Sequence, residues 1–110
     1  MVDFEHFLQV EMHVGTIIAV EDFPKAKKPS FQLTIDFGET IGIKRSSAQI
    51  TTLYTKETLL GRQIIAVTNF PKRQIANFFS EVLVLGSVDA DGVVTLLQPE
   101  RGVANGLRLG

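Results

Sequence analysis

The amino-acid sequence predicts an all-β fold, a small five-stranded barrel formed by a single domain over residues 1–110. Five or six short segments are rich in β-branched residues or alternate between apolar and polar residues, and glycine, proline or polar turns bound them. Helical patterning is confined to a short N-terminal segment and to one segment between the third and fourth predicted strands. These observations indicate short strands in sequence, interrupted by one helix.

Composition limits the functions that the chain can have. Hydrophobic residues make up 45% of the chain and the mean hydropathy is +0.18, which favours a partner on part of the surface, and we expect a homodimer. The formal net charge is −1 and the pI is about 6.1, so binding to nucleic acid would need a local basic patch. No apolar run is long enough to cross a membrane, and the acidic N-terminus is unlike a signal peptide. We expect a soluble, cytoplasmic protein.

The first elements are a short helix and a strand. Asp3 is an expected helix cap, and Phe4, Phe7 and Leu8 follow at the spacing that forms one apolar stripe. We expect this stripe to pack against its own domain, and a second subunit is the alternative. Residues 13–20 form the first strand, in which a glycine at position 15 predicts a bulge or sharp bend.

An exposed loop and a hairpin follow. Residues 21–30 contain two prolines and three lysines, which predicts a cationic loop. Residues 31–36 alternate between apolar and polar residues and form the second strand, and Gly38 with Glu39 turns the chain into the third strand. We expect Ile41 and Ile43 to point together into the core, because they are two residues apart.

The second half contains one predicted helix and the remaining strands. Residues 51–60 are expected to form the helix, with Thr55 as its cap and Gly61 as its end. Strands are predicted over residues 63–69, 81–88 and 93–97, with a cationic loop after the first, a turn at residues 89–92 and an irregular tail from residue 98 that includes Val103, Leu107 and Leu109 for docking.

This order suits a Greek-key barrel of the OB type, with a short helix between strands three and four and a short N-terminal helix. An SH3-like barrel or another small sandwich would have a similar number of strands.

No residue pattern indicates catalysis or a bound metal. Cysteine is absent, and the two histidines, His6 and His13, lie in different predicted elements. None of the serines lies in a G-x-S-x-G motif, the nine glycines are dispersed, and Asp89 and Asp91 are typical of a turn. We expect no enzyme activity, no metal and no cofactor, and an enzyme is the weakest of three function classes.

The cations are the most informative residues. They lie in the loop after strand one, at the end of strand three and in the loop after strand four, positions that can converge on the nucleic-acid face of an OB barrel. Several acids fall in the terminal segments and in the turn at residues 89–92, away from these cations. Glu21 and Asp22, just before the first cationic loop, argue against a basic face. Phe23, Phe70 and Phe78 lie near the cations, where they can stack on bases or belong to the core.

Polar residues follow the third strand directly, from Lys44 to Gln49. Such a donor-rich run suits a phosphate or an extended main chain, and a solvated loop is the alternative. With the cationic loops it gives the predicted groove residues Lys25, Lys27, Lys28, Lys44, Arg45, Ser46, Ser47, Gln49, Asn69, Lys72, Arg73 and Ser80.

Four segments together extend over nearly the whole chain: DFPKAKKPSFQLTIDFG, GIKRSSAQIT, NFPKRQIANFFSEVLVLG and VANG. In these segments the chain resembles CsaA, a family of export-related chaperones built on the tRNA-binding OB domain of the EMAP-II-like and methionyl-tRNA synthetase modules. The resemblance implies a homodimeric OB fold that binds tRNA and unfolded or exported polypeptides, with a link to the export machinery. Among the groove residues, it implies roles for Lys44, Ser46, Ser47, Gln49, Asn69, Arg73 and Ser80.

The chain departs from the wider tRNA-binding family at three places. Glu11, Met12 and His13 stand where that family usually has an aspartate, a leucine or isoleucine and an arginine, which removes one cation. Asn77 stands where glycine is common, and asparagine tolerates left-handed backbone angles. Residues 82–83 are Val-Leu where the synthetase modules have Gly-Met. Two hypotheses follow, a structure-specific tRNA-binding module and a peptide-binding chaperone, and both can use one surface.

Overall fold

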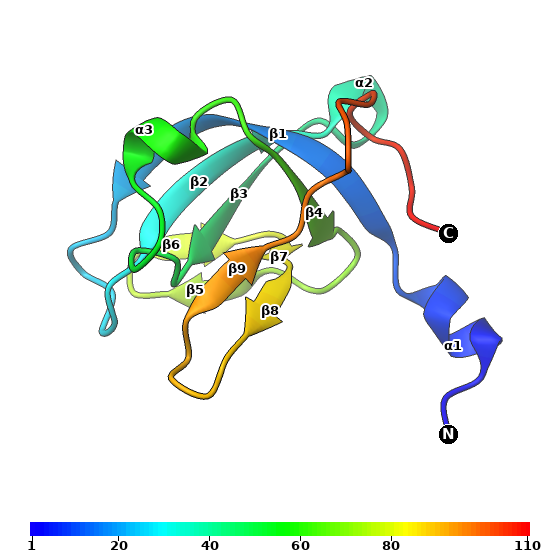
Figure 1. Ribbon diagram of the computed structural model, residues 1–110, viewed down its shortest axis with the longest axis horizontal. Helices are drawn as coiled ribbons and strands as arrows, with labels where there is room; N and C mark the ends of the chain where they lie inside the picture. The colour runs from blue at the N-terminus through cyan, green and yellow to red at the C-terminus, as the bar shows by residue number, and fades with distance from the viewer.

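The computed structural model describes residues 1–110 and is a nearly closed antiparallel barrel (Figure 1). Five strands form one sheet in the order β3-β2-β1-β4-β7. Their bounds are Met12–Asp22 for β1, Phe31–Asp36 for β2, Ile43–Ala48 for β3, Gln63–Val67 for β4 and Leu83–Val84 for β7. The predicted all-β Greek-key barrel of the OB type is confirmed.

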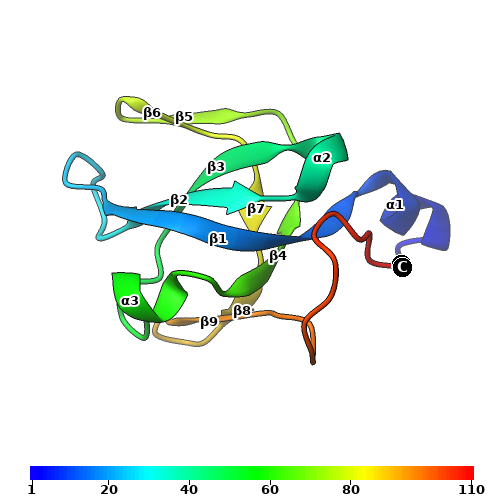
Figure 2. The same ribbon diagram turned by 90° about the horizontal axis from the view of Figure 1, so that it is seen from above.

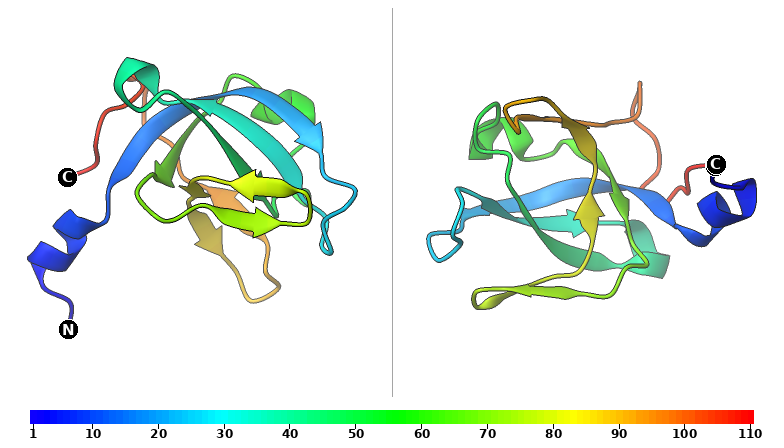
Figure 3. Two further views of the ribbon diagram at one scale, coloured as in Figure 1. Left: turned by 180° about the vertical axis from the view of Figure 1, so that it is seen from behind. Right: turned by 90° about the horizontal axis from the view of Figure 1, so that it is seen from below.

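Two hairpins and three short helices complete the fold. The hairpins join β5 to β6 and β8 to β9, and they lie on opposite sides of β7 (Figures 2 and 3). None of the helices is both long and apolar enough to span a bilayer. The bounds are Phe4–Gln9 for α1, Gly38–Ile41 for α2, Lys56–Leu59 for α3, Arg73–Ile75 for β5, Phe78–Ser80 for β6, Gly86–Val88 for β8 and Val94–Leu96 for β9.

The barrel core is formed by the alternating apolar residues of the sheet. On β2, Phe31, Leu33 and Ile35 are buried and the residues between them are only partly covered, as the sequence predicts. Full burial of each such side chain stabilises the fold by about 1.5–3 kcal/mol at most. The cluster also contains Ile17, Phe37, Ile50, Leu59, Ile64, Ala66, Val82 and Leu96.

Gly15 of β1 is required by close packing and not by a bulge. A Cβ atom at this position would lie 2.6 Å from Ile35 Cγ2 and 2.8 Å from the Phe37 ring, so only glycine lets this side chain and ring approach the strand. The irregularity in β1 falls instead between Ile17 and Ala19, where the register with β2 shifts. The predicted bulge therefore exists, but its predicted position was wrong.

The connection from β2 to β3 also differs from the prediction. The expected turn is the helix α2, whose Ile41 packs against the core, but Ile43 is 59% exposed and does not. Gly42 has a φ of 85°, which changes the direction of the chain before β3. As a result, Ser46 of β3 is buried opposite Leu33, and Ile43 faces solvent. The prediction for Ile43 was wrong because the alternation of inward and outward side chains does not continue through Gly42.

The helix predicted over residues 51–60 is only one turn long. Its predicted cap is confirmed, because the Thr58 backbone N–H donates to Thr55 Oγ1 at 3.2 Å. Its predicted end at Gly61, which has a φ of 84°, is also confirmed. The residues before the cap form a turn that places Tyr54, whose hydroxyl accepts a hydrogen bond from the Leu96 N–H at 2.9 Å.

The second half contains one more hairpin than predicted and a broken strand. The cationic loop after β4 folds into the β5–β6 hairpin, whose left-handed residue is Ala76, with a φ of 54°, and not Asn77. The single strand predicted over residues 81–88 breaks at Leu85, because its N–H donates to Ile65 while its carbonyl accepts from Leu97. The chain thereby passes from the barrel sheet to the β8–β9 hairpin.

The N-terminal helix does not pack on the barrel, so this prediction was wrong. It contains no buried residue, Phe4 is 70% exposed, and it extends away from the sheet (Figure 1). Its end is nevertheless held in place, because Asn69 Nδ2 donates to the Gln9 carbonyl at 2.7 Å and Arg108 Nη2 donates to the Leu8 carbonyl. The tail runs beside β1 without forming a strand, as predicted.

Candidate functional site

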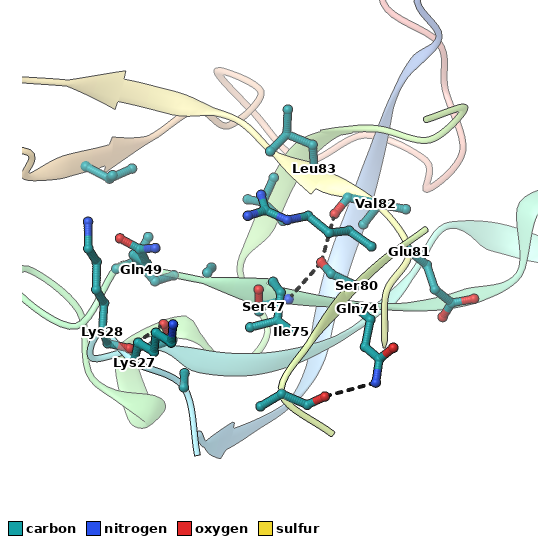
Figure 4. Close-up of a pocket in the computed structure, with 18 of the residues that line it drawn as sticks. Lys27, Lys28, Ser47, Gln49, Gln74, Ile75, Ser80, Glu81, Val82 and Leu83 are labelled. Atoms are coloured by element: carbon teal, nitrogen blue, oxygen red, sulfur yellow. Dashed lines mark hydrogen bonds between the residues drawn. The ribbon is translucent and has the colours of Figure 1, made fainter. Parts of the chain in front are cut away.

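A groove of about 1080 Å³ opens at the end of the barrel where both hairpins lie. Its floor is the segment that leads into β7, with Val82, Leu83 and Val84. The β5–β6 hairpin and the lysine loop at residues 24–29 form one side, and the β8–β9 hairpin forms the other (Figure 3). Figure 4 shows Lys27 and Lys28 at one end of the groove, with Ser47 and Ser80 joined further along.

One wall of the groove is cationic. Lys25, Lys27, Lys28 and Arg73 line it and are all exposed, and none of them forms a salt bridge. The only acid among the lining residues is Glu81. Four cations without anionic partners present a local positive field although the net charge of the chain is −1.

One of the two acids that precede the lysine loop, Asp22, is already paired. Lys56 Nζ donates to Asp22 Oδ2 at 3.0 Å, and this hydrogen bond and its Coulomb attraction raise the pKa of Lys56. Asp22 therefore forms its ion pair with a lysine of α3, and it does not compete with a ligand for the loop lysines.

The two serines of the third strand have different environments: Ser47 lines the groove, and Ser46 does not. Ser80 Oγ accepts a hydrogen bond from the Ser47 N–H at 3.1 Å, and both residues line the groove. Ser46 is fully buried, and its hydroxyl donates to the Val82 carbonyl at 3.1 Å. Ser46 is therefore a structural link between β3 and the strand that follows Ser80, and it cannot reach a ligand.

Four other predicted residues lie outside the groove lining. The Asn69 side chain is hydrogen-bonded to the N-terminal segment, where its Oδ1 accepts a hydrogen bond from the Glu11 N–H at 3.0 Å. Lys72 Nζ lies 5.2 Å from the centroid of the Phe79 ring, and Arg45 covers the Phe78 ring. Lys44 is half-buried and does not line the groove. The structure thus brings together Lys25, Lys27, Lys28, Ser47, Gln49, Arg73 and Ser80.

The opposite wall is apolar, and none of its residues is among the predicted groove residues. Val88 is 66% exposed, and Val94 lies across the same hairpin from it. Asp89 forms the predicted turn, since its Oδ1 accepts from the N–H groups of Asp91 and Val93, both at 2.9 Å. This turn is the tip of a groove wall, but neither Asp89 nor Asp91 lines the groove. Hydrophobic residues in short strands give no sequence signal of such a role.

The three candidate aromatic residues have different environments. Phe23 and Phe78 are each 4% exposed and pack together outside the barrel core. Phe70 is 46% exposed and lines the groove, so it alone of the three is accessible to a ligand. His13 is buried, and its Nδ1 lies 2.8 Å from Thr68 Oγ1, so it packs inside the protein.

The groove offers contacts for binding. Its polar side chains supply positive charge, amide groups and hydroxyls, and its floor and second wall supply apolar surface. No histidine lies beside Ser47 or Ser80, and no group of three acidic or histidine side chains gathers anywhere in the chain. This combination suits a polyanion or an extended polypeptide.

Comparisons with known proteins agree with this geometry. Residues 12–108 match the family described as "Putative tRNA binding domain". The chain is 49% identical to the chaperone CsaA from Bacillus anthracis, with a TM-score of 0.95 over 100% of this chain and 99% of that one. It is 48% identical to the CsaA chaperone protein from Picrophilus torridus, with a TM-score of 0.92 over 100% of both chains.

Matches to longer proteins cover only a part of them. The chain is 35% identical to a methionine–tRNA ligase from Porphyromonas gingivalis over 103 residues, which are 94% of this chain and 15% of that protein. It therefore spans about 15% of the length of the curated relatives it matches. From the family match over residues 12–108 and the two full-length structural likenesses, we conclude that the chain belongs to the tRNA-binding domain family and is CsaA-like.

Proposed function

We propose that the protein binds tRNA through the cationic wall of the groove and binds unfolded or exported polypeptides through the apolar wall. The observation that carries the proposal is the position of Lys25, Lys27, Lys28 and Arg73 on one wall, exposed and free of salt bridges. The membership in a tRNA-binding family supports the first part. Both ligands would then meet the same groove.

Electrostatics makes the tRNA part testable. Cations that replace the counterions of phosphates make binding fall steeply with salt, by roughly 0.7–0.9 in log affinity per log salt for each phosphate contact. Arg73 and Lys72 are neighbours of equal charge, but only Arg73 lines the groove. The variant Arg73→Gln should therefore lower the salt slope by about one contact, and Lys72→Gln should leave it unchanged. Equal slopes for both variants would contradict the groove as the tRNA site.

The apolar wall supports the polypeptide part. Phe70, Leu83 and Val88 are exposed apolar residues of the groove, and β5 pairs only with β6, so its other edge is open. An extended polypeptide can pair its main chain with that edge, which lies on the cationic side, and place alternate side chains against the apolar floor and the opposite wall. The two structural likenesses are to proteins named as chaperones, which favours the same ligand.

Competition separates the two proposed roles. A labelled unfolded polypeptide bound to the protein should be released by tRNA if both ligands occupy the groove. Suppression of client aggregation should also fall when tRNA is added. A protein that binds tRNA but neither binds a preprotein peptide in calorimetry nor suppresses aggregation would be a dedicated tRNA-binding module without a chaperone role.

We further propose a cytoplasmic homodimer that acts near the protein export machinery. The exposed side chains of Phe4 and Leu8 on α1 support a second copy, because isolated apolar stripes of this kind are usually covered. Sedimentation should give a dimer for the parent chain and a monomer for Leu8→Asp. A monomeric parent would contradict this part of the proposal.

A further inference from the structure

A small aromatic cluster lies outside the barrel core and joins two parts of the groove. Phe23 immediately precedes the lysine loop, and Phe78 begins β6. Each is 4% exposed, their ring centroids are 5.3 Å apart and the rings are tilted by 57°, yet neither belongs to the core of the barrel. Because tilted aromatic rings at this distance attract each other, the loop and the hairpin are joined at this point.

Arg45 covers this cluster from β3. Its Cζ lies 4.6 Å from the centroid of the Phe78 ring, and its Nη2 donates to Gln32 Oε1 at 3.1 Å. A guanidinium stacked on a ring and bound to an amide has its planar face and one donor already occupied. Its side chain does not line the groove.

The backbone of Arg45 holds the other end of the same hairpin. The Arg45 N–H donates to Glu81 Oε1 at 3.0 Å, and the Glu81 N–H donates to the Arg45 carbonyl at 2.8 Å. Arg45 is thus attached to the hairpin at the start of β6 through its side chain and after the end of β6 through its backbone. The hairpin is joined to β3 at one further point, where the Ser47 N–H donates to Ser80 Oγ at 3.1 Å.

We propose that Arg45 is a positioning residue of the groove and not a ligand contact, and that Phe23, Phe78 and Arg45 form a clasp that fixes both cationic segments together. The clasp keeps a fixed distance between the lysine loop and the hairpin that carries Arg73, so a ligand meets a preformed cationic wall. The effect of the clasp on ligand binding rests on the proposed function of the groove. The clasp itself holds the two segments together whether or not a ligand is bound.

The salt dependence of tRNA binding distinguishes positioning from contact. In Arg45→Met the number of phosphates that the protein neutralises does not change, so the salt slope should equal that of the parent chain. In Arg73→Met the slope should fall by roughly 0.7–0.9. A fall of that size in Arg45→Met would overturn the proposal, whatever its affinity.

Amide hydrogen exchange tests the clasp without tRNA. The reporter is the Glu81 N–H, and the control is the β1–β4 ladder of the barrel. Loss of one partly exposed cation–π contact should speed Glu81 exchange roughly two- to fivefold in Arg45→Met, and Arg45→Lys should restore it only in part because an ammonium lacks the planar face. Unchanged exchange at Glu81 would overturn the clasp.

Phe23→Leu tests the coupling between the two segments. This change keeps an apolar side chain in the lysine-loop half of the clasp, yet it should speed exchange at Glu81, which lies beyond the hairpin. Faster exchange confined to the Ala26 N–H, which donates to the Phe23 carbonyl, would overturn the coupling. If the parent chain bound no tRNA, the proposed function would fail while these exchange measurements still decided the clasp.

Discussion

The two hairpins that border the groove have similar backbones but opposite chemistry. Each consists of two three-residue antiparallel strands that extend from the same end of the barrel. The β5–β6 hairpin carries Arg73 and lies beside the lysine loop, whereas the β8–β9 hairpin presents Val88 and Val94 and ends in an acidic turn. One groove can therefore attract a polyanion on one side and an apolar chain on the other.

This asymmetry explains how a chain of net charge −1 can hold a basic site. Most acids of the chain are absent from the groove lining, and Asp22, which is next to the lysine loop, is bound to Lys56. The cationic wall depends on where charges lie and not on their sum. Changes on the two walls should then affect the two proposed ligands differently.

The largest effect is expected from the lysine loop. Replacing Lys25, Lys27 and Lys28 by glutamine should lower the salt slope of tRNA binding by roughly two to three, because each lysine replaces about one counterion. The slope is measured from titrations at several salt concentrations. The matched control replaces Lys44, Lys72 and Arg101, which lie outside the groove, by glutamine and removes the same charge. A similar fall in the control would show that only net charge matters.

The second effect concerns the apolar wall. Val88→Asp should weaken binding of an unfolded polypeptide roughly tenfold, because it removes a burial worth about 1.5 kcal/mol. The measurement is peptide affinity by calorimetry, with Val88→Thr as a milder control. The salt slope for tRNA should stay unchanged. Equal peptide affinity of the parent chain and Val88→Asp would place the polypeptide elsewhere.

A third effect separates structure from binding at the serines. Ser46→Ala should lower the free energy of unfolding by about 1 kcal/mol, because it removes a buried hydroxyl and leaves the Val82 carbonyl without this donor. The midpoint of thermal unfolding should fall by roughly 4 °C. The salt slope for tRNA should match that of the parent chain. A lower slope with unchanged stability would restore Ser46 as a ligand contact.

The smallest effect is expected at the acidic tip of the apolar wall. Asp91 is exposed, and its side chain makes no hydrogen bond, so Asp91→Asn removes one charge without a structural cost. Since solvent and salt screen exposed charges, tRNA affinity should rise by less than roughly twofold at 0.15 M salt. A rise of tenfold would mean that this wall lies much closer to the tRNA phosphates than we propose.

The barrel could be predicted from the sequence because its signals are local. The alternation of β2, the Thr55 cap and the Gly61 helix end each depend on a few neighbouring residues. The position of Ile43 could not be predicted in this way, since one positive φ at Gly42 separates its pattern from that of Ile41.

The groove was only partly predictable because it is built from distant segments. The lysine loop and Arg73 have a clear charge signal, and the fold brings them to one wall. Ser46 and Asn69 have the right chemistry, but the fold uses their side chains internally. The β5–β6 hairpin turns at Ala76 and Asn77 without a glycine, so its turn signal is weak, and the positive φ falls on Ala76.

The most direct test is to map tRNA onto the protein by amide chemical shifts. Titration with tRNA should perturb the amides of residues 25–28, 47–49 and 73–76, and the perturbations should weaken together as salt is raised. The amides of α1 and of the tail at the other end of the barrel should not move. Perturbations confined to that end, with residues 25–28 and 73–76 unaffected, would contradict the groove as the tRNA-binding site.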